Sequence, residues 1–341
     1  MNATNPRVTI GVFDSGFGGL TVLRELLPLI PGAHYVYLGD TARLPYGSKS
    51  RATIARYAVD SVRFLLGHGA ETLVIACNTA TALAFPEILS VAENTPVVGV
   101  IEPGTQAAQA AALAGGNPHV LVLATAATVE SHAYERALSR LGLQATQKAC
   151  PLLVPLIEEG WVDHPVTRDV LRIYLREALD TCSPGVVILG CTHYPLIAPL
   201  VSKTLLELGS NAQVIDSARA TALVVSHGVR NRIDAKPSQP DEDAEKVVFE
   251  IGRDFSPRIT EKVVSEIGRD FSPGITGAES MRALAPGTRF SSLSAQDPPF
   301  SAASNASFEC YATDSTEKFA RLGSQFLGQP IPQVKLLDLG G

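Results

Sequence analysis

The stretch Val186–Pro195 reads V-V-I-L-G-C-T-H-Y-P, and the fold depends on the pattern it contains. A short apolar run ends at Gly190, and Cys191, Thr192 and His193 follow directly. Such a run predicts a buried strand, here with a thiol at its carboxyl end. Upstream, Leu73–Thr79 repeats the pattern as L-V-I-A-C-N-T. We therefore expect the chain to bring two thiols together around one small molecule.

Similar apolar runs alternate with helical patterns along most of the chain. A single helix is expected over 127–141, and 151–161 is expected to be a loop. This alternation predicts an α/β protein with mainly parallel sheets covered by helices. Ligands of such sheets bind beyond the carboxyl ends of the strands. Polar or reactive residues stand at several of these expected ends, namely Asp14, Asp40, Cys77, Thr125 and Cys191.

The composition is that of a globular chain of about two domains, with 341 residues, 45% apolar and 18% charged. A net charge of −6 without a basic stripe gives no reason to expect nucleic-acid binding. No apolar run approaches the ~20 residues of a membrane span, and the first residues lack the pattern of a signal peptide. The five scattered cysteines favour a reduced, cytoplasmic protein without a disulfide framework or metal knuckle.

The regular alternation breaks near residue 233. Glu245–Thr260 and Glu261–Thr276 form a tandem duplication, identical at 14 of 16 positions. The residues that follow are rich in Ser, Pro, Gly and Ala. We expect 233–307 to be a largely irregular insertion, because two copies are too few for a solenoid. Order is expected to return with a strand over 308–313 and a helix that Asp314 caps and Gly328 ends.

Two thiols in matching contexts suggest acid–base chemistry. Both motifs are expected to open helices, whose N-termini favour thiolates. One thiolate could remove an α-proton while the opposite thiol supplies one, which is the chemistry of a racemase. A cysteine hydrolase using Cys191 and His193 is an alternative, but it leaves Cys77 and Asp14 without a role. A redox pair is a further alternative, although no C-x-x-C is present.

The segment Asp14–Gly19 reads D-S-G-F-G-G and partly matches a dinucleotide fingerprint. Thr21 stands at the third glycine position, and the Asp14 carboxylate would repel a pyrophosphate. An amino-acid ligand suits this loop better, with its backbone N–H groups binding a carboxylate. The dinucleotide interpretation stays open as an alternative.

Taken together, these motifs resemble the glutamate racemases of the aspartate/glutamate racemase family. The resemblance covers about 8–228 and resumes over 308–339. It rests on motifs that occur in the family's order: FDSGFGGLTV, GDTARLPYGSKS, ACNTATA, GVIEPG, ATAATVESHAY, CPLLVPLIEEG and GCTHYPL. The insertion departs from the family pattern.

The resemblance implies roles for individual residues. Cys77 would take the proton from D-glutamate and Cys191 from L-glutamate. Asp14 and Asp40 would assist near Cys77, and Glu158 and His193 would assist near Cys191. His193 favours glutamate over aspartate, which is the runner-up substrate. The family's substrate-binding positions fall on Asp14, Ser15, Tyr46, Gly47, Asn78, Thr79, Thr192 and His193.

The resemblance also implies two similar α/β domains with the active site in the cleft between them. The first domain would comprise 1–100 and 212–341, and the second 101–211. No cofactor and no metal are implied. A homodimer that supplies D-glutamate for peptidoglycan in a bacterial cytoplasm is expected.

Overall fold

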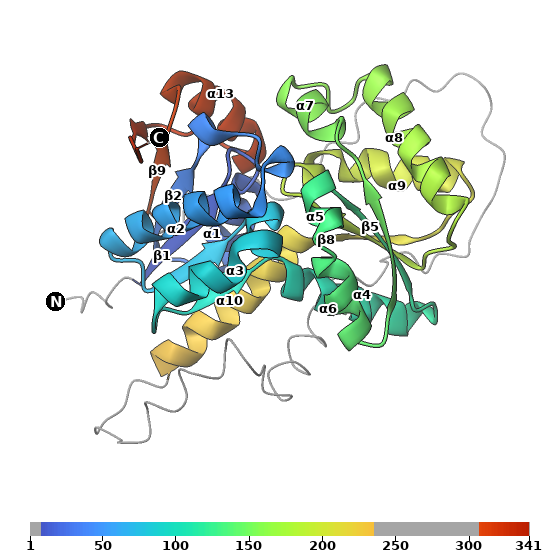
Figure 1. Ribbon diagram of the computed structural model, residues 1–341, viewed down its shortest axis with the longest axis horizontal. Helices are drawn as coiled ribbons and strands as arrows, with labels where there is room; N and C mark the ends of the chain where they lie inside the picture. Colours follow the sequence, from blue (N-terminus) through green and yellow to red (C-terminus); the bar gives the residue numbers. More distant parts are fainter. Residues whose placement is uncertain (1–7, 235–306, 341) are drawn as a thin grey trace.

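The computed structural model describes residues 8–234 and 307–340 (Figure 1). For residues 231–234 it describes the backbone alone. The duplication at 245–276 and nearly all of the expected insertion lie outside the described residues. The described chain forms two α/β domains, each built on a parallel sheet. The predicted fold class is therefore confirmed.

The first domain contains a six-stranded sheet in the order β10-β9-β2-β1-β3-β4, and every pair of neighbours is parallel. Its strands are β1 (Thr9–Asp14), β2 (His34–Gly39), β3 (Thr72–Ile75), β4 (Val97–Gly99), β9 (Ser307–Ala312) and β10 (Val334–Leu336). Its helices are α1 (Leu20–Leu29), α2 (Arg51–Gly67), α3 (Asn78–Ala92), α10 (Ser217–Asp234) and α13 (Thr316–Leu327). Short 3-10 helices follow β2, at Thr41–Arg43 and Tyr46–Ser48.

The second domain contains a four-stranded parallel sheet in the order β6-β5-β7-β8. Its strands are β5 (His119–Ala124), β6 (Gln144–Ala149), β7 (Val186–Gly190) and β8 (Gln213–Asp216). Its helices are α4 (Ile101–Gly115), α5 (Ala126–Glu130), α6 (Ala133–Arg140), α7 (Leu153–Glu158), α8 (Pro165–Leu179) and α9 (Ala198–Glu207).

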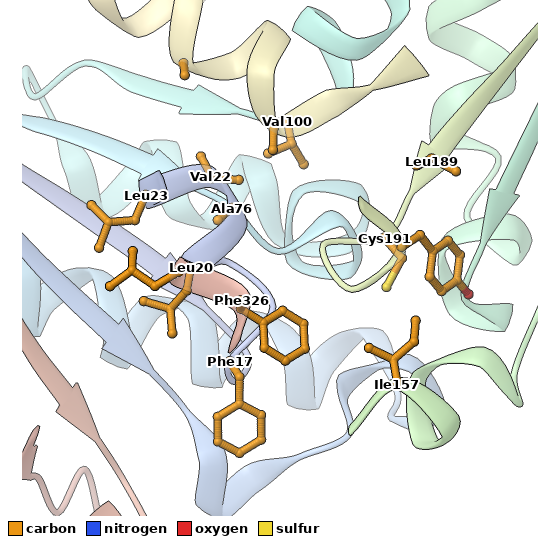
Figure 2. Close-up of a cluster of buried hydrophobic side chains, with 14 of the residues drawn as sticks. Phe17, Leu20, Val22, Leu23, Ala76, Val100, Ile157, Leu189, Cys191 and Phe326 are labelled. Atoms are coloured by element: carbon orange, nitrogen blue, oxygen red, sulfur yellow. The ribbon is translucent and has the colours of Figure 1, made fainter. Parts of the chain in front are cut away.

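The central strands are apolar throughout because both sheets are covered on both faces. In β1, Val12 joins the core under α1 and α13, whereas Phe13 joins the core under α2 and α3. In β7, Leu189 and Ile188 are divided between two cores in the same way. One of these cores contains residues of both domains. Figure 2 shows its junction, where Phe326 of α13 lies near Ile157 and Cys191 of the second domain.

The chain returns to the first domain later than residue 212. β8 pairs with β7 in register Val186↔Gln213, so the second sheet includes residues up to Asp216. The return is made by α10, which packs against α1 of the first domain and α4 of the second. The expected domain boundary at residue 212 would assign β8 to the first domain, whereas β8 pairs with the sheet of the second domain.

Two local expectations differ from the structure. The single helix expected over 127–141 is divided into α5 and α6, because His132 has a φ of 54°. The Ser131 hydroxyl donates to the Thr128 carbonyl and accepts from the Ala133 N–H, so it competes with the helical backbone bonds. The loop expected over 151–161 contains α7, which tolerates Pro155 because it lies in the first turn.

The C-terminal segment completes the first domain. β9 pairs with β2 from His34↔Ser307 to Gly39↔Ala312, and α13 packs on α1. Ser315, rather than Asp314, caps this helix by accepting from the Lys318 N–H, and Gly328 ends it with a φ of 76° as predicted. Phe319 is fully buried, with its ring centroid 5.5 Å from that of Phe17.

Phe319→Ala should therefore lower the free energy of unfolding by about 3–5 kcal/mol, through lost burial and the cavity left behind. Urea denaturation followed by circular dichroism measures this change. Leu113→Ala is the control, because Leu113 is 74% exposed and its loss should change stability by less than about 0.5 kcal/mol. Equal effects of the two substitutions would contradict the packing of the C-terminal helix as described.

Candidate active site

A cavity of about 570 Å³ lies between the two domains. Both predicted thiols, Cys77 and Cys191, line it, although each side chain is largely buried. Nearly all other predicted site residues line it as well: Ser15, Tyr46, Gly47, Asn78, Thr79, Glu158, Thr192 and His193. Asp14 and Asp40 stand behind this lining layer. The carboxyl ends of the two sheets thus face the same space, as expected for parallel sheets.

Cys77 lies at the N-cap of α3, directly after β3. Its Sγ accepts from the Ala80 N–H at 3.4 Å, and its S–H donates to Ser15 Oγ at 3.5 Å. Burial raises the pKa of Cys77 to about 12, and the nearby Asp14 charge adds to this, while the hydrogen bonds from Ser15 and Ala80 oppose it. Cys77 is therefore held as a neutral thiol at physiological pH.

Asp14 ends β1 and is fully buried. Its Oδ2 accepts from the Gly16 N–H at 2.8 Å, and its Oδ1 accepts from the Thr192 hydroxyl at 3.4 Å. Burial raises the pKa of Asp14 above its usual value, although the charge of His193 and these hydrogen bonds lower it. The Gly16 N–H thus binds the chain's own carboxylate. Of the N–H groups of Ser15–Gly19 expected to bind a ligand, that of Gly16 is already bonded within the chain. The same carboxylate disfavours a pyrophosphate there.

Cys191 has a different environment from Cys77. A turn and the 3-10 helix Tyr194–Ile197 follow it, and α9 begins only at Ala198. The prediction that both thiols open α-helices is therefore correct for Cys77 and wrong for Cys191. Pro195 contributes to this difference, because a proline ring has no N–H for a regular helical bond.

No α-helix begins at Cys191, and His193 is the polar group that lies beside its thiol. Its Nδ1 lies 3.8 Å from Cys191 Sγ, and its Nε2 lies 2.9 Å from Glu158 Oε1. Burial lowers the pKa of His193, but the hydrogen bonds and charges of Cys191 and Glu158 outweigh it and raise the pKa to about 10. The imidazole is therefore held as a cation between a sulfur and a carboxylate.

The two domains touch closely beside these groups. The Thr21 hydroxyl donates to the Thr192 carbonyl at 3.1 Å. A Cβ atom on Gly18 would overlap Thr192 Oγ1 and would lie 2.6 Å from His193 Nδ1. Only glycine fits this position without displacing the second-domain turn that carries Cys191. The sequence showed a glycine-rich loop here but could not show which surface it contacts.

Asp40 supports the cavity wall from behind. Its Oδ2 accepts from the Tyr46 hydroxyl at 2.5 Å and from Arg43 Nε at 2.7 Å, and its Oδ1 accepts from Thr313 at 2.9 Å. Tyr46 lines the cavity, whereas Asp40 does not. Asp40 therefore acts on the site by fixing Tyr46. Its Thr313 partner comes from the C-terminal segment, which no motif at residue 40 indicates.

Asn78 and Thr79 begin α3 and connect to the second domain. Asn78 Oδ1 accepts from the Tyr134 hydroxyl at 2.7 Å, and its buried Nδ2 has no hydrogen-bond partner. Thr79 Oγ1 lies 3.1 Å from that of Thr125 and 3.2 Å from that of Thr128. Thr125 also lines the cavity, and it lies directly after β5, at the N-cap of α5. Its position at an expected strand end is the sequence pattern that indicated a role in the site.

Two further features of the described chain concern metal binding and membrane spans. In residues 8–234 and 307–340, no three His, Cys, Asp or Glu side chains are grouped so as to hold a metal ion. None of the helices described there is long and apolar enough to cross a membrane.

Comparison with known proteins shows which family the chain resembles. The family described as Asp/Glu/Hydantoin racemase matches residues 10–225. A glutamate racemase of Koribacter versatilis is 46% identical over 338 residues, covering 98% of this chain and 99% of that protein. A glutamate racemase structure from Francisella tularensis in complex with D-glutamate matches 98% of both chains, with a TM-score of 0.70 and 27% identity. A glutamate racemase structure from Bacillus anthracis has a TM-score of 0.71 and 28% identity, covering 98% of this chain and 99% of that one.

The Asp14 carboxylate should slow alkylation of Cys77. Asp14→Asn removes a negative charge that raises the Cys77 pKa, so the thiolate fraction should increase. We expect iodoacetamide to modify Cys77 roughly threefold faster or more at pH 9, measured by peptide mass spectrometry. Cys310 is the internal control, because burial alone raises its pKa to about 12. An unchanged Cys77 rate, or an equal change at Cys310, would contradict the charge effect.

Proposed function

The chain belongs to the Asp/Glu/hydantoin racemase family, and we propose that it interconverts L-glutamate and D-glutamate by proton transfer between the α-carbon and two thiols. The observation that carries this proposal is the position of Cys77 and Cys191 on one cavity, each supplied by a different domain. A racemase needs an acid and a base on opposite faces of one carbon. The chain's own thiols can supply both groups.

The two thiols have different surroundings, and we assign them complementary roles. Cys191, with His193 Nδ1 3.8 Å from its sulfur and Glu158 bound to the other side of the imidazole, is placed as the base that removes an α-proton. The raised pKa of Cys77 keeps a proton available for delivery to the other face. After one transfer the protonation states of the thiols are exchanged, so the reverse reaction uses the same groups in opposite roles. On this proposal, Cys191 acts on L-glutamate and Cys77 on D-glutamate.

Polar groups on the cavity can bind the charges of an amino acid. The unpaired Nδ2 of Asn78 and the hydroxyl of Ser15 are donors for carboxylates. Thr192 also lines the cavity, although its hydroxyl donates to Asp14 in this structure. Asp14 lies behind Thr192 and beside Cys77, where its charge can attract an ammonium group or influence the thiol. Tyr46, Gly47 and Thr79 complete the proposed substrate-binding set, with Asp40 as the support of Tyr46.

Glutamate is favoured over the aspartate alternative by the relatives and by His193. The Koribacter versatilis relative, which spans nearly the whole chain, is a glutamate racemase. His193 stands where related aspartate racemases carry an acidic residue, and here it is bound to Glu158 at 2.9 Å. An acidic residue in its place would lie against that carboxylate and repel it.

The Cys191–His193–Glu158 arrangement also has the order of a cysteine hydrolase triad. A hydrolase would use one nucleophile, whereas Cys77 occupies an equivalent strand end on the same cavity. Racemisation is therefore the function that uses all of the observed groups.

The cellular setting is proposed from the family. The product D-glutamate would serve peptidoglycan synthesis in a bacterial cytoplasm, and the active form would be a homodimer. No cofactor is required by the two-thiol mechanism.

Replacing either thiol should abolish racemisation. Cys77→Ser and Cys191→Ser should each lower the rate by at least about a hundredfold, since a serine hydroxyl is far too weak an acid to exchange the α-proton. Polarimetry and α-proton exchange in heavy water measure the reaction from either enantiomer. Cys182→Ser is the matched control, because Cys182 is buried in the second domain and does not line the cavity.

Full racemisation by Cys77→Ser, with loss only in Cys191→Ser, would contradict the two-thiol mechanism. A wild-type enzyme that neither racemises glutamate nor exchanges its α-proton would leave the hydrolase as the alternative.

Ligand-dependent stability separates the three candidate ligands. D-glutamate at a concentration of 100 times its Kd should raise the free energy of unfolding by about 2.7 kcal/mol. D-aspartate at the same concentration should have a smaller effect, and NAD should have none. Thermal unfolding with each ligand measures these differences. Stabilisation by NAD alone would restore the dinucleotide-binding alternative.

A further inference from the structure

Tyr134 belongs to the second domain but contacts a cavity residue of the first. It lies on α6, is fully buried, and donates its hydroxyl proton to Asn78 Oδ1 at 2.7 Å. Of the four other fully buried tyrosines, three donate to backbone carbonyls, namely Tyr35, Tyr37 and Tyr194. The fourth, Tyr46, donates to Asp40, which does not line the cavity. A backbone carbonyl satisfies a tyrosine without affecting a ligand. Tyr134 differs because its partner is a side chain on the cavity.

The hydrogen bond determines which end of the Asn78 amide faces the cavity. An amide group carries an acceptor at Oδ1 and two donors at Nδ2. Because the phenol donates to Oδ1, the orientation of the amide is fixed, and the buried Nδ2 of this cavity-lining residue has no partner among the described residues. A buried donor without a partner costs roughly 1–3 kcal/mol. A ligand with a hydrogen-bond acceptor would remove this cost.

Tyr134 is itself held in the role of donor. Burial raises the pKa of Tyr134 well above its usual value, so the phenol stays protonated. A Cβ atom on Gly104 of α4 would lie 3.9 Å from the phenol oxygen. Ser217 of α10 is close to the same place, because that Cβ atom would lie 3.2 Å from Ser217 Cβ. The hydroxyl therefore sits where α4 and α10 meet Asn78 on α3.

The break between α5 and α6 places Tyr134 at this position. A continuous helix would carry Tyr134 in another direction, but the positive φ of His132 starts α6 anew two residues before Tyr134. Asn78 and Tyr134 belong to different domains, so their hydrogen bond also requires the domain arrangement that forms the cavity. Substrate binding by Asn78 is thereby connected to that arrangement.

We propose that Tyr134 is a positioning residue that presents the Asn78 amide donors to a carboxylate of the amino-acid substrate. The proposal rests on the proposed racemase function. A correctly oriented amide holds the substrate so that its α-carbon lies between the thiols. With the amide reversed, Oδ1 would face the carboxylate and repel it.

The test is a double-mutant cycle in the full-length enzyme, with racemisation of both glutamate enantiomers as readout. Tyr134→Phe should raise KM about tenfold for both enantiomers and change kcat less than about threefold. Asn78→Ala should raise KM at least as much. In the Asn78→Ala background, adding Tyr134→Phe should change KM by less than about twofold, because no amide remains to orient.

Tyr35→Phe is the matched control. It also removes one buried hydroxyl, which donates to the Leu26 and Ile30 carbonyls, and it should leave KM unchanged. Independent, additive KM effects of Tyr134→Phe and Asn78→Ala would overturn the proposal, as would an unchanged KM in Tyr134→Phe. If the wild-type enzyme itself fails to racemise glutamate, the proposed function fails instead.

A second variant tests the orientation while leaving Tyr134 intact. Asn78→Asp keeps an oxygen for the Tyr134 hydroxyl but replaces the outward donor with a second oxygen. At pH 8 this variant should raise KM more than Asn78→Ala, because a carboxylate would face the substrate carboxylate. A KM equal to that of the wild type would overturn the proposed orientation.

Discussion

The contact between the turn after β1 and the turn after β7 is the constraint on which the site depends. Gly18 approaches Thr192 and His193 so closely that a side chain would not fit, and Thr21 binds the Thr192 carbonyl. This contact joins the carboxyl ends of two parallel sheets. Because every reactive residue follows a strand of one of these sheets, fixing the two ends against each other assembles the cavity.

Two similar sequence motifs acquire opposite electrostatic partners across this contact. Cys77 lies in a buried helix start beside the Asp14 carboxylate, which favours the neutral thiol. Cys191 lies beside an imidazole that Glu158 binds on its other side. On the proposed mechanism one thiol gives a proton to the α-carbon while the other removes one, and the neighbouring carboxylate and imidazole distinguish the two thiols.

The C-terminal segment reaches both halves of this arrangement. Thr313 binds Asp40, which holds Tyr46 against the cavity, and the Phe326 ring lies 5.1 Å from the His193 ring. Figure 2 shows Phe326 at the junction of the two domains. Residues from the beginning, middle and end of the chain are thus combined in one site. Residues of β9, α13 and the loop between them therefore support the active-site wall from behind, without lining the cavity.

The sequence by itself determined the α/β class, the strand ends and both thiols, because apolar runs of strand length and their polar successors are local patterns. It did not determine the division of α5 from α6, since the Ser131 hydroxyl had to compete successfully with the helical backbone. The helix expected at Cys191 was replaced by a turn and a 3-10 helix. The tertiary structure alone decided that Asp40 stands behind Tyr46, that Gly18 meets His193 and that Tyr134 binds Asn78. The contacts of Gly18 and Tyr134 join residues of different domains, and Asp40 is held by Thr313 from the end of the chain, so their geometry arises only when these segments pack.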